Sequence, residues 1–144
     1  VLWNGTCIVH ETFSEKELIK MKVRTDDAKI IAHPECPENI LKHADFIGST
    51  SSLLRFISTN ESKRFIVATE PHIIHQMKKN EPNKEFLIAP GNDGECSCSN
   101  CPYMELNTLE KLRDCLLNLS PEINIDNELI LKAKKPLNTM LKLS

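Results

Sequence analysis

Residues 29–52 read KIIAHPECPENILKHADFIGSTSS and contain two short apolar runs, each followed directly by polar residues and a segment of helical character. Such runs, rich in Ile, Val or Phe and bounded by polar residues or proline, are typical of buried strands. Their alternation with amphipathic segments is the signature of β-α units around a mostly parallel sheet. The stretch therefore predicts an α/β fold with three layers.

The same unit recurs along the first half of the chain. We expect strands at residues 6–9, 29–32, 45–48, 64–68 and 85–88, and helices at 14–24, 37–43, 51–58 and 71–79. Two of these helices carry start signals, because Ser14 and Glu17 have capping-box spacing and Pro37 stands at a first-turn position. This regular order predicts that the β-α unit repeats along the chain, although its amino-acid sequence does not.

The pattern stops at residues 89–102, where glycines and three cysteines indicate an irregular loop. Helical spacing then returns in two apolar stripes, one of Leu106, Leu109, Leu112, Leu116 and Leu119 and one of Leu129, Ile130, Ala133, Leu137 and Met140. Pro136 predicts a kink or break in the last helix. The length allows one ordinary domain or two small ones, with a boundary near 60–63 or 80–84.

Composition narrows the class of protein. The chain has 144 residues, 40% hydrophobic and 26% charged, and a net charge of −2, which indicates neither disorder nor a membrane protein. No block of like charge is long enough to bind nucleic acid. Because the chain begins at Val1 without Met or an apolar leader, we expect a fragment of a longer protein. Six cysteines then indicate a metal or redox set in a reducing compartment such as the cytoplasm.

Polar residues follow four of the expected strands directly. They are His10 and Glu11, residues 33–36, residues 49–51, and Thr69 and Glu70. In open α/β sheets the ligand crevice lies outside the carboxyl ends of the strands, beside helix N-termini that favour anions. These junctions therefore predict one pocket that supplies imidazole, carboxylate and hydroxyl groups.

Each candidate also has a structural interpretation. Ser49 and Thr50 can be simple helix caps, and His10 can be a satisfied structural histidine. The carboxylate of Glu35, at the end of a buried run with His33, needs either a partner or a function. The remaining histidines, His43, His72 and His75, have charged neighbours and are interpreted as surface residues.

The cysteines fall into three groups. Cys96, Cys98 and Cys101 form a CxCxxC run that can approach one metal, although a structural zinc site would need a fourth ligand. Cys7 and Cys36 lie at strand ends with the other site candidates. Cys115 lies beside leucines on a helix and is interpreted as a small core residue.

Four motifs, CIVHETF, HPECPENILKHADFIGSTS, FIVATE and CPYMELNTLEKL, together resemble the quinolinate synthase family, in order and over the whole chain. The resemblance implies a fold of three similar α/β domains around a central 4Fe-4S cluster. It also implies that residues 1–62 are the second domain and residues 63–144 the third, with the cysteine loop at 91–102.

Within this resemblance, Cys7 and Cys101 match cluster ligands, and the third cysteine ligand belongs to a first domain that precedes Val1. Glu35 and His33 match catalytic residues, with Glu35 the acid/base group. His10, His33, Glu35, Ser49 and Thr50 match substrate-binding residues, the last two for carboxylate or phosphate oxygens. The open iron would act as a Lewis acid.

The family condenses iminoaspartate with dihydroxyacetone phosphate to quinolinate for NAD biosynthesis, releasing phosphate and water. The resemblance implies these small molecules as substrates, L-aspartate oxidase as the upstream enzyme and the missing amino-terminal domain as a partner, with no nucleic acid or membrane. The chain alone is expected to be inactive. Family members with extra cysteines in the last loop tend towards CxxCxxC, whereas only Ser97 separates Cys96 from Cys98.

Two other classes of function stay open. One is a non-enzymatic zinc or iron-sulfur binding module, in which CxCxxC holds the metal and the strand-end residues are caps. The other is a thiol redox protein that uses Cys98 and Cys101. It is the weaker alternative, because this CxxC does not open a helix directly after a strand.

Overall fold

The computed structural model describes residues 5–91 and 100–143, and the chain divides into two compact units, residues 1–105 and 106–144. Each unit is described by itself. The first contains strands β1 (Lys29–Ala32), β2 (Phe46–Ile47), β3 (Arg64–Ala68) and β4 (Glu85–Ile88). Its helices are α1 (Ile8–Glu11), α2 (Glu15–Arg24), α3 (Glu38–Leu41), α4 (Thr50–Thr59) and α5 (Ile73–Asn80), and the 3-10 helix η2 (Met104–Leu106) lies at the boundary.

The four strands form one parallel sheet in the order β2-β1-β3-β4. Along the central pair, Ile30 lies opposite Ile66 and Ala32 opposite Ala68. The α/β class and the parallel sheet are therefore confirmed. The predictions for β1, β3 and β4 match the observed bounds, because the apolar residues that follow the first, charged position of each strand are buried, or partly buried in β4, by helices on both faces of the sheet.

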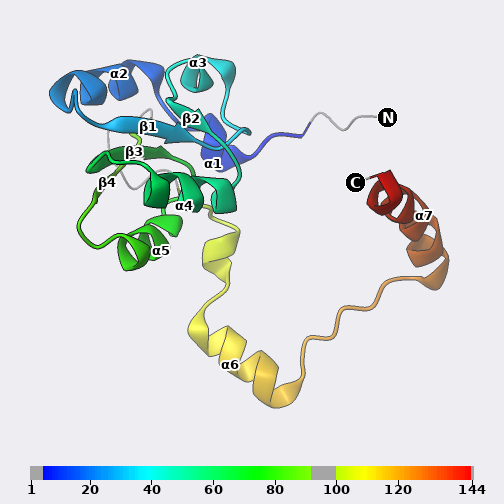
Figure 1. Cartoon of the computed structure of the whole chain (residues 1–144). Helices are drawn as coiled ribbons and strands as arrows, with labels where there is room; N and C mark the ends of the chain where they lie inside the picture. Colours follow the sequence, from blue (N-terminus) through cyan, green and yellow to red (C-terminus); the bar gives the residue numbers. More distant parts are fainter. Residues whose placement is uncertain (1–4, 92–99, 144) are drawn as a thin grey trace. The chain divides into compact units, whose positions relative to one another are not determined.

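Helices cover both faces of this sheet, which confirms the three-layer architecture (Figure 1). Successive strand residues point to opposite faces. Ile30 and Ile66 therefore pack in a core with residues of α2 and α3, whereas Ile31 and Phe65 pack with residues of α4 and α5. The two cores hold the sheet rigidly, so its carboxyl edge is a fixed platform for side chains.

The expected strand at residues 6–9 is wrong, because this segment leads into the short helix α1. The carbonyl oxygen of Cys7 accepts hydrogen bonds from the backbone N–H groups of His10 and Glu11, at 3.0 and 3.2 Å. Ile8 is 48% exposed, while Val9 and His10 are buried. An apolar run of this length fits either a strand or a helix, and here the hydrogen bonds to the Cys7 carbonyl form a helical turn.

The expected boundary between residues 62 and 63 lies between two strands of one sheet, and the division into two family domains there stays a prediction. Strand β1 precedes this position and β3 follows it, and the two pair along their whole length. The chain divides into its two compact units after Glu105. The described part of the second unit consists of helices, so it does not repeat the α/β architecture of the first.

The second unit contains α6 (Leu109–Asn118) and α7 (Asn127–Leu143). The side chain of Thr108 caps α6 by accepting the N–H of Lys111 at 3.3 Å. Helix α7 continues through Pro136, so the helix does not break there, and a kink at this position stays a prediction. Cys115 is partly exposed rather than a core residue, since this unit has no buried residue among those described.

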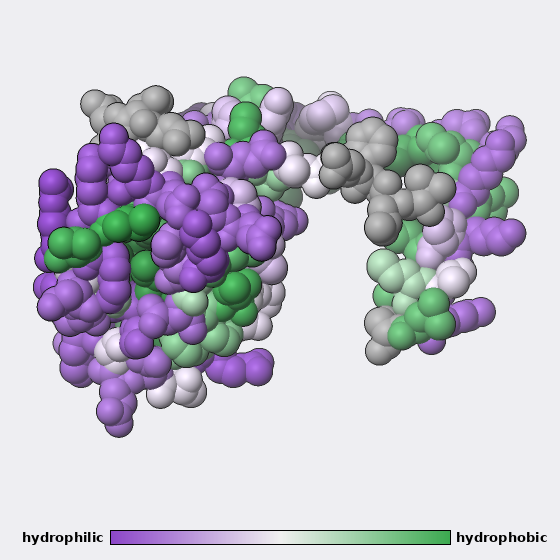
Figure 2. Space-filling model, turned by 90° about the horizontal axis from the view of Figure 1, so that it is seen from above, coloured by the Kyte–Doolittle hydropathy of each residue, from purple (hydrophilic) through white to green (hydrophobic). Residues whose placement is uncertain are grey.

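The apolar stripes of both helices are exposed, and hydrophobic patches lie beside charged ones on the surface (Figure 2). Among the described helices, none combines the length and the apolar character that crossing a membrane would require.

Candidate functional site

The sheet topology places the candidate site between β1 and β3. Strand β2 lies on one side of β1, and β3 lies on the other, so the direction of the strand order reverses there. Ligands of open α/β sheets bind at such a switch point, outside the carboxyl ends of the strands. His33 follows β1 and Thr69 follows β3, and the N–H of His33 donates to the Ala68 carbonyl at 3.1 Å.

His10 projects from α1 into this switch point and is only 5% exposed. Its Nε2 lies 3.2 Å from the hydroxyl oxygen of Thr69, which is also buried. Its ring stacks on that of His33, with centroids 4.6 Å apart and an angle of 5° between the planes. The structure thus brings together the two histidines that the sequence predicts for the site.

Glu35 completes this group from the loop after β1. Its Oε2 lies 3.2 Å from Nδ1 of His10 and 3.8 Å from Nδ1 of His33. The Glu35 N–H donates to His33 Nδ1 at 3.3 Å, so this nitrogen is the acceptor of the ring in that arrangement. Glu35 is 59% exposed, and its carboxylate is therefore open to an incoming ligand.

The charge state of His10 follows from its surroundings. Burial lowers its pKa most strongly, and the neighbouring His33 lowers it further, while Glu35 opposes both. His10 is therefore a neutral imidazole near pH 7. Its Nδ1 makes no hydrogen bond of acceptable geometry among the described residues, although Glu35 is close.

Cys7 is the third member of a possible ligand group. It occupies the N-cap position of α1, and one ligand atom from each of Cys7, His10 and Glu35 lies within 4.8 Å of the others. The sequence predicts all three for the site, and the structure places them in one cluster.

Cys101 lies near α1 as well. The residues on either side of it, Asn100 and Pro102, line a cavity of about 240 Å³ together with Ile8 and Val9 of that helix and Thr12. Cys101 is partly exposed. Cys96 and Cys98 lie outside the described residues.

Ser49 and Thr50 stand at the start of α4, after β2. The Ser49 hydroxyl accepts the Ser52 N–H at 3.4 Å and lies 3.0 Å from the Ser52 hydroxyl, as a helix cap does. Both Ser49 and Thr50 are exposed at this helix N-terminus. Their role toward a substrate stays a prediction.

Cys36 is close to the site but is a structural thiol. It is buried, and its Sγ donates to the Ala68 carbonyl at 3.3 Å. Burial raises the pKa of this thiol to about 12. Cys36 is therefore protonated at neutral pH and unsuited to binding a metal.

The remaining histidines lie away from this cluster. His72 and His75 are exposed, as expected for surface residues. His43 is partly buried and its Nε2 lies 2.8 Å from Glu15, so it joins α3 to α2.

Thr69 is among the polar residues that the sequence places after an expected strand, but the sequence gives it no role of its own. It follows β3 directly, which is the same signal that identified His33 after β1. Its contact with His10 joins residues 59 positions apart, and that pairing depends on the register of β1 and β3.

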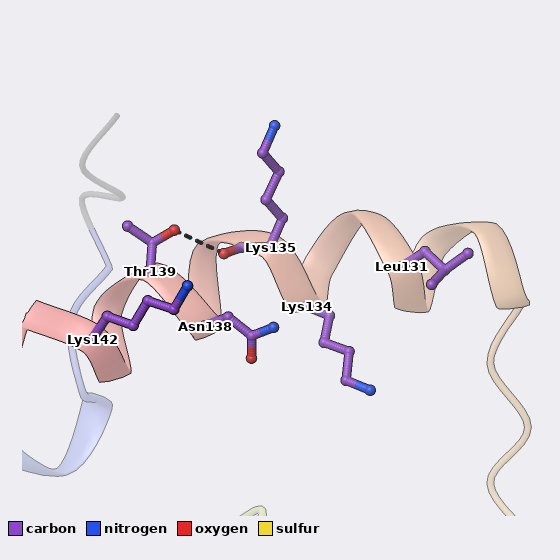
Figure 3. A pocket seen from close by; sticks show the side chains of 6 residues that line it. All are labelled: Leu131, Lys134, Lys135, Asn138, Thr139 and Lys142. Carbon is purple, nitrogen blue, oxygen red and sulfur yellow. Dashed lines mark hydrogen bonds between the residues drawn. The ribbon is translucent and has the colours of Figure 1, made fainter.

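Two larger hollows lie in the second unit. One, of about 710 Å³, is lined by residues of α6 and the segment after it, among them Leu112, Cys115 and Pro121. The other, of about 390 Å³, runs along α7. Figure 3 shows the ammonium groups of Lys134 and Lys135 pointing to opposite sides of this helix, so they do not converge on one ligand.

The fold and the site define an α/β protein with a polar, thiol-containing site at the switch point of a parallel sheet. A family model described as "NadA: Quinolinate synthetase A protein" matches residues 1–142, and the chain belongs to this family.

Curated relatives named quinolinate synthase support the same family membership. The chain is 55% identical over 144 residues to that of Microcystis aeruginosa and 52% identical over 144 residues to that of Trichodesmium erythraeum. It is 58% identical over 146 aligned positions to that of Ehrlichia chaffeensis. All of the chain is covered, but only 45%, 44% and 46% of these relatives, so it spans just under half their length.

Proposed function

We propose that the whole protein is a quinolinate synthase, to which this chain contributes part of the active site. The reaction joins iminoaspartate to dihydroxyacetone phosphate and releases quinolinate, phosphate and two waters. One observation carries the proposal: the stacked His10 and His33, with Glu35 beside them, lie at the switch point of a chain that is 55% identical to a curated relative of that name.

Glu35 is the proposed acid/base group. Condensation, tautomerisation and dehydration all move protons, and a positioned carboxylate assists each of them. Its exposed carboxylate can reach a substrate, while its backbone N–H holds His33 through Nδ1. Because Nδ1 of His33 accepts this N–H, its Nε2 carries the ring proton and is presented as a donor.

The proposed substrate contacts use the remaining groups. His10 is held against Thr69 and beneath His33, which fixes the plane of its ring. Ser49 and Thr50 lie at the N-terminus of a ten-residue helix, where carboxylate or phosphate oxygens are favoured. His10, His33 and Glu35 would therefore orient the reacting carbons, and the helix would bind the anionic end.

The donors of this chain fit part of a 4Fe-4S cluster. Cys7 and Cys101 are both partly exposed thiols, and the segment around Cys101 lies against the helix that Cys7 caps. Cys7 and Cys101 would hold the cluster with one cysteine from outside the chain. When bound, the cluster would supply a Lewis-acidic iron for the loss of water.

Partners and compartment follow from this proposal. The amino-terminal portion of the protein would supply the third ligand and the other wall of the site. Iminoaspartate would come from an oxidation of aspartate, by L-aspartate oxidase. A cluster held by thiolates needs reduced cysteines, and the proposed compartment is the cytoplasm.

Replacing Glu35 with Gln in the complete protein tests the acid/base assignment. The Gln variant keeps the size of the side chain, so we expect an unchanged cluster spectrum and a loss of about 10²- to 10⁴-fold in quinolinate formation. Glu38→Gln, on the exposed face of α3, is the matched control. An unchanged rate for Glu35→Gln would contradict the assignment.

A further inference from the structure

We propose that the 144-residue chain by itself binds one divalent transition-metal ion of the Zn²⁺ class, through the Cys7 thiolate, Nδ1 of His10 and the Glu35 carboxylate. This mononuclear site is distinct from the proposed cluster. Both would use the same Cys7 thiolate, so one excludes the other. The inference goes beyond the proposed function and does not depend on it.

The distances suit a small tetrahedral ion. Zn²⁺ binds imidazole nitrogen and carboxylate oxygen at roughly 2.0–2.2 Å, so two such ligands lie roughly 3.3 Å apart along one edge of the tetrahedron. Nδ1 of His10 and Oε2 of Glu35 are 3.2 Å apart. The Cys7 sulfur lies within 4.8 Å of a ligand atom of each of these two residues.

The buried ring of His10 provides independent evidence for this site. His10 is 95% buried, being 5% exposed, and its Nδ1 lacks a hydrogen bond among the described residues. A buried polar atom without a hydrogen bond destabilises the fold. A metal ion between His10 and Glu35 removes this effect, because the Nδ1 lone pair becomes a ligand.

Thr69 selects the tautomer that such a ligand needs. When Nε2–H of His10 donates to the Thr69 oxygen, 3.2 Å away, Nδ1 keeps its lone pair and faces Glu35. Histidines that bind metals usually donate their other ring N–H to a partner in this way. Thr69 is therefore the positioning residue of the site.

The charges also match a divalent ion. A thiolate and a carboxylate carry two negative charges, and the imidazole is neutral. The set of S, N and O donors favours Zn²⁺ or Co²⁺ over Mg²⁺ or Ca²⁺, which prefer oxygen alone. Three protein ligands leave the fourth position open on the exposed side of Glu35, as in catalytic rather than structural zinc sites.

Titration with Co²⁺ under anaerobic conditions tests the proposal. The protein is the metal-free 144-residue chain with Cys96→Ser and Cys98→Ser, so the CxCxxC run cannot contribute. We expect one equivalent of Co²⁺ to give a thiolate-to-cobalt charge-transfer band and the visible bands of tetrahedral cobalt, both removed by Zn²⁺. Far-UV circular dichroism establishes that each variant is folded.

Variants then assign the ligands. Cys7→Ser should abolish the charge-transfer band, and His10→Gln and Glu35→Gln should each weaken affinity at least about tenfold. Thr69→Val should weaken it by about 10- to 100-fold, and Thr69→Ser, which restores the hydroxyl, should rescue it. Cys36→Ser and Glu38→Gln are matched controls and should bind Co²⁺ like the parent.

Three outcomes would overturn the proposal. They are no saturable binding, a charge-transfer band that survives Cys7→Ser, and a band that is lost only with Cys101→Ser. None of them bears on the proposed function, which is measured as quinolinate formation by the complete protein.

Discussion

The polar groups at the two ends of the parallel sheet differ in whether they have hydrogen-bond partners. At the amino end, the Arg64 guanidinium donates to Asp27 at 2.8 Å and to Glu85 at 2.6 Å, and Lys29 donates to Asp45 at 2.8 Å. At the carboxyl end, the buried Nδ1 of His10 lacks a hydrogen bond among the described residues, and two imidazoles stack on each other. The partnered groups stabilise the fold, whereas the unpartnered ones are available to a ligand.

The parallel topology explains this division. Helices that follow parallel strands end at the amino edge of the sheet, where their last carbonyl groups need donors. Lys84, just before β4, donates to the carbonyls of Ile57 and Asn60 at the end of α4. Helices begin at the carboxyl edge, and the loops there present side chains to a ligand.

The largest expected effect concerns the buried thiol at the carboxyl end. Because burial raises the Cys36 pKa to about 12, its thiolate fraction at pH 8 is roughly 10³-fold below that of an ordinary thiol. We expect iodoacetamide to modify Cys36 about 1000-fold more slowly in the native chain than in urea, as measured by peptide mass spectrometry. Rates within tenfold of each other would place Cys36 among the ligand-accessible groups and contradict its assignment as a buried structural thiol.

Lys84 tests the amino end. The Lys84→Met variant removes both hydrogen bonds from the end of α4, and bonds to charged groups contribute about 1.5–3 kcal/mol. Its side chain is only 9% exposed, so solvent cannot fully replace these bonds. We expect urea unfolding of the chain to show a loss of about 2 kcal/mol.

The matched control for Lys84 is Lys79→Met, an exposed lysine in the last turn of α5. Its expected effect is within about 0.5 kcal/mol. Equal losses for the two variants would mean that the amino end is not specially stabilised.

Asp45 gives a smaller, pH-dependent effect at the amino end. Burial alone would raise the pKa of Asp45, but hydrogen bonds from Lys29 and from the Ile30 N–H outweigh it and hold the pKa below its usual value. Its contribution is therefore present above the unfolded pKa, near 3.9, and is lost as pH falls through the lower folded pKa.

We expect Asp45→Asn to lose about 1 kcal/mol at pH 7, and the difference from the parent to shrink on acidification. Urea unfolding at several pH values measures this difference. Asp26→Asn, at an exposed position, is the control. A difference that stays constant with pH would exclude the proposed linkage.

The smallest effect belongs to a partnered pair at the carboxyl end. Nδ1–H of His72 donates to the Glu70 carboxylate, 2.5 Å away, and this hydrogen bond raises the pKa of His72, whose side chain is 71% exposed. The small stabilisation is present below the usual histidine pKa and is lost as pH rises through the higher folded value. NMR titration should show Glu70→Gln returning the His72 pKa toward 6.5. An unchanged pKa would mean that the ion pair does not form in solution.

The sequence predicted most of the sheet. Residues 29–32, 64–68 and 85–88 each carry an apolar run after one charged residue, which is typical of strands in a sheet covered on both faces. Residues 6–9 were misread because an isolated apolar run has no period, and only the bonds to the Cys7 carbonyl make it helical. Secondary structure was therefore predictable for the segments that the sheet buries.

The site was predictable as a list of residues but not as a geometry. Strand-end positions identified His10, His33 and Glu35, because the carboxyl edge of an α/β sheet binds ligands. The stacking of the two histidines and the Thr69 contact depend on how β1 and β3 align, which sequence spacing does not contain. Likewise, the hydrogen bond of Ser49 fits its interpretation as a helix cap. Its predicted role in substrate binding can be tested only with a bound substrate.

The most direct test of the proposed function compares two proteins under anaerobic conditions: this chain alone, and this chain joined to the amino-terminal portion of the Microcystis aeruginosa relative. Iron, sulfide and quinolinate are quantified in both. We expect about four irons with sulfide, and quinolinate formation, only in the joined protein, with both lost in Cys7→Ser and Cys101→Ser. A joined, folded protein that carries no iron-sulfur cluster and forms no quinolinate would contradict the account.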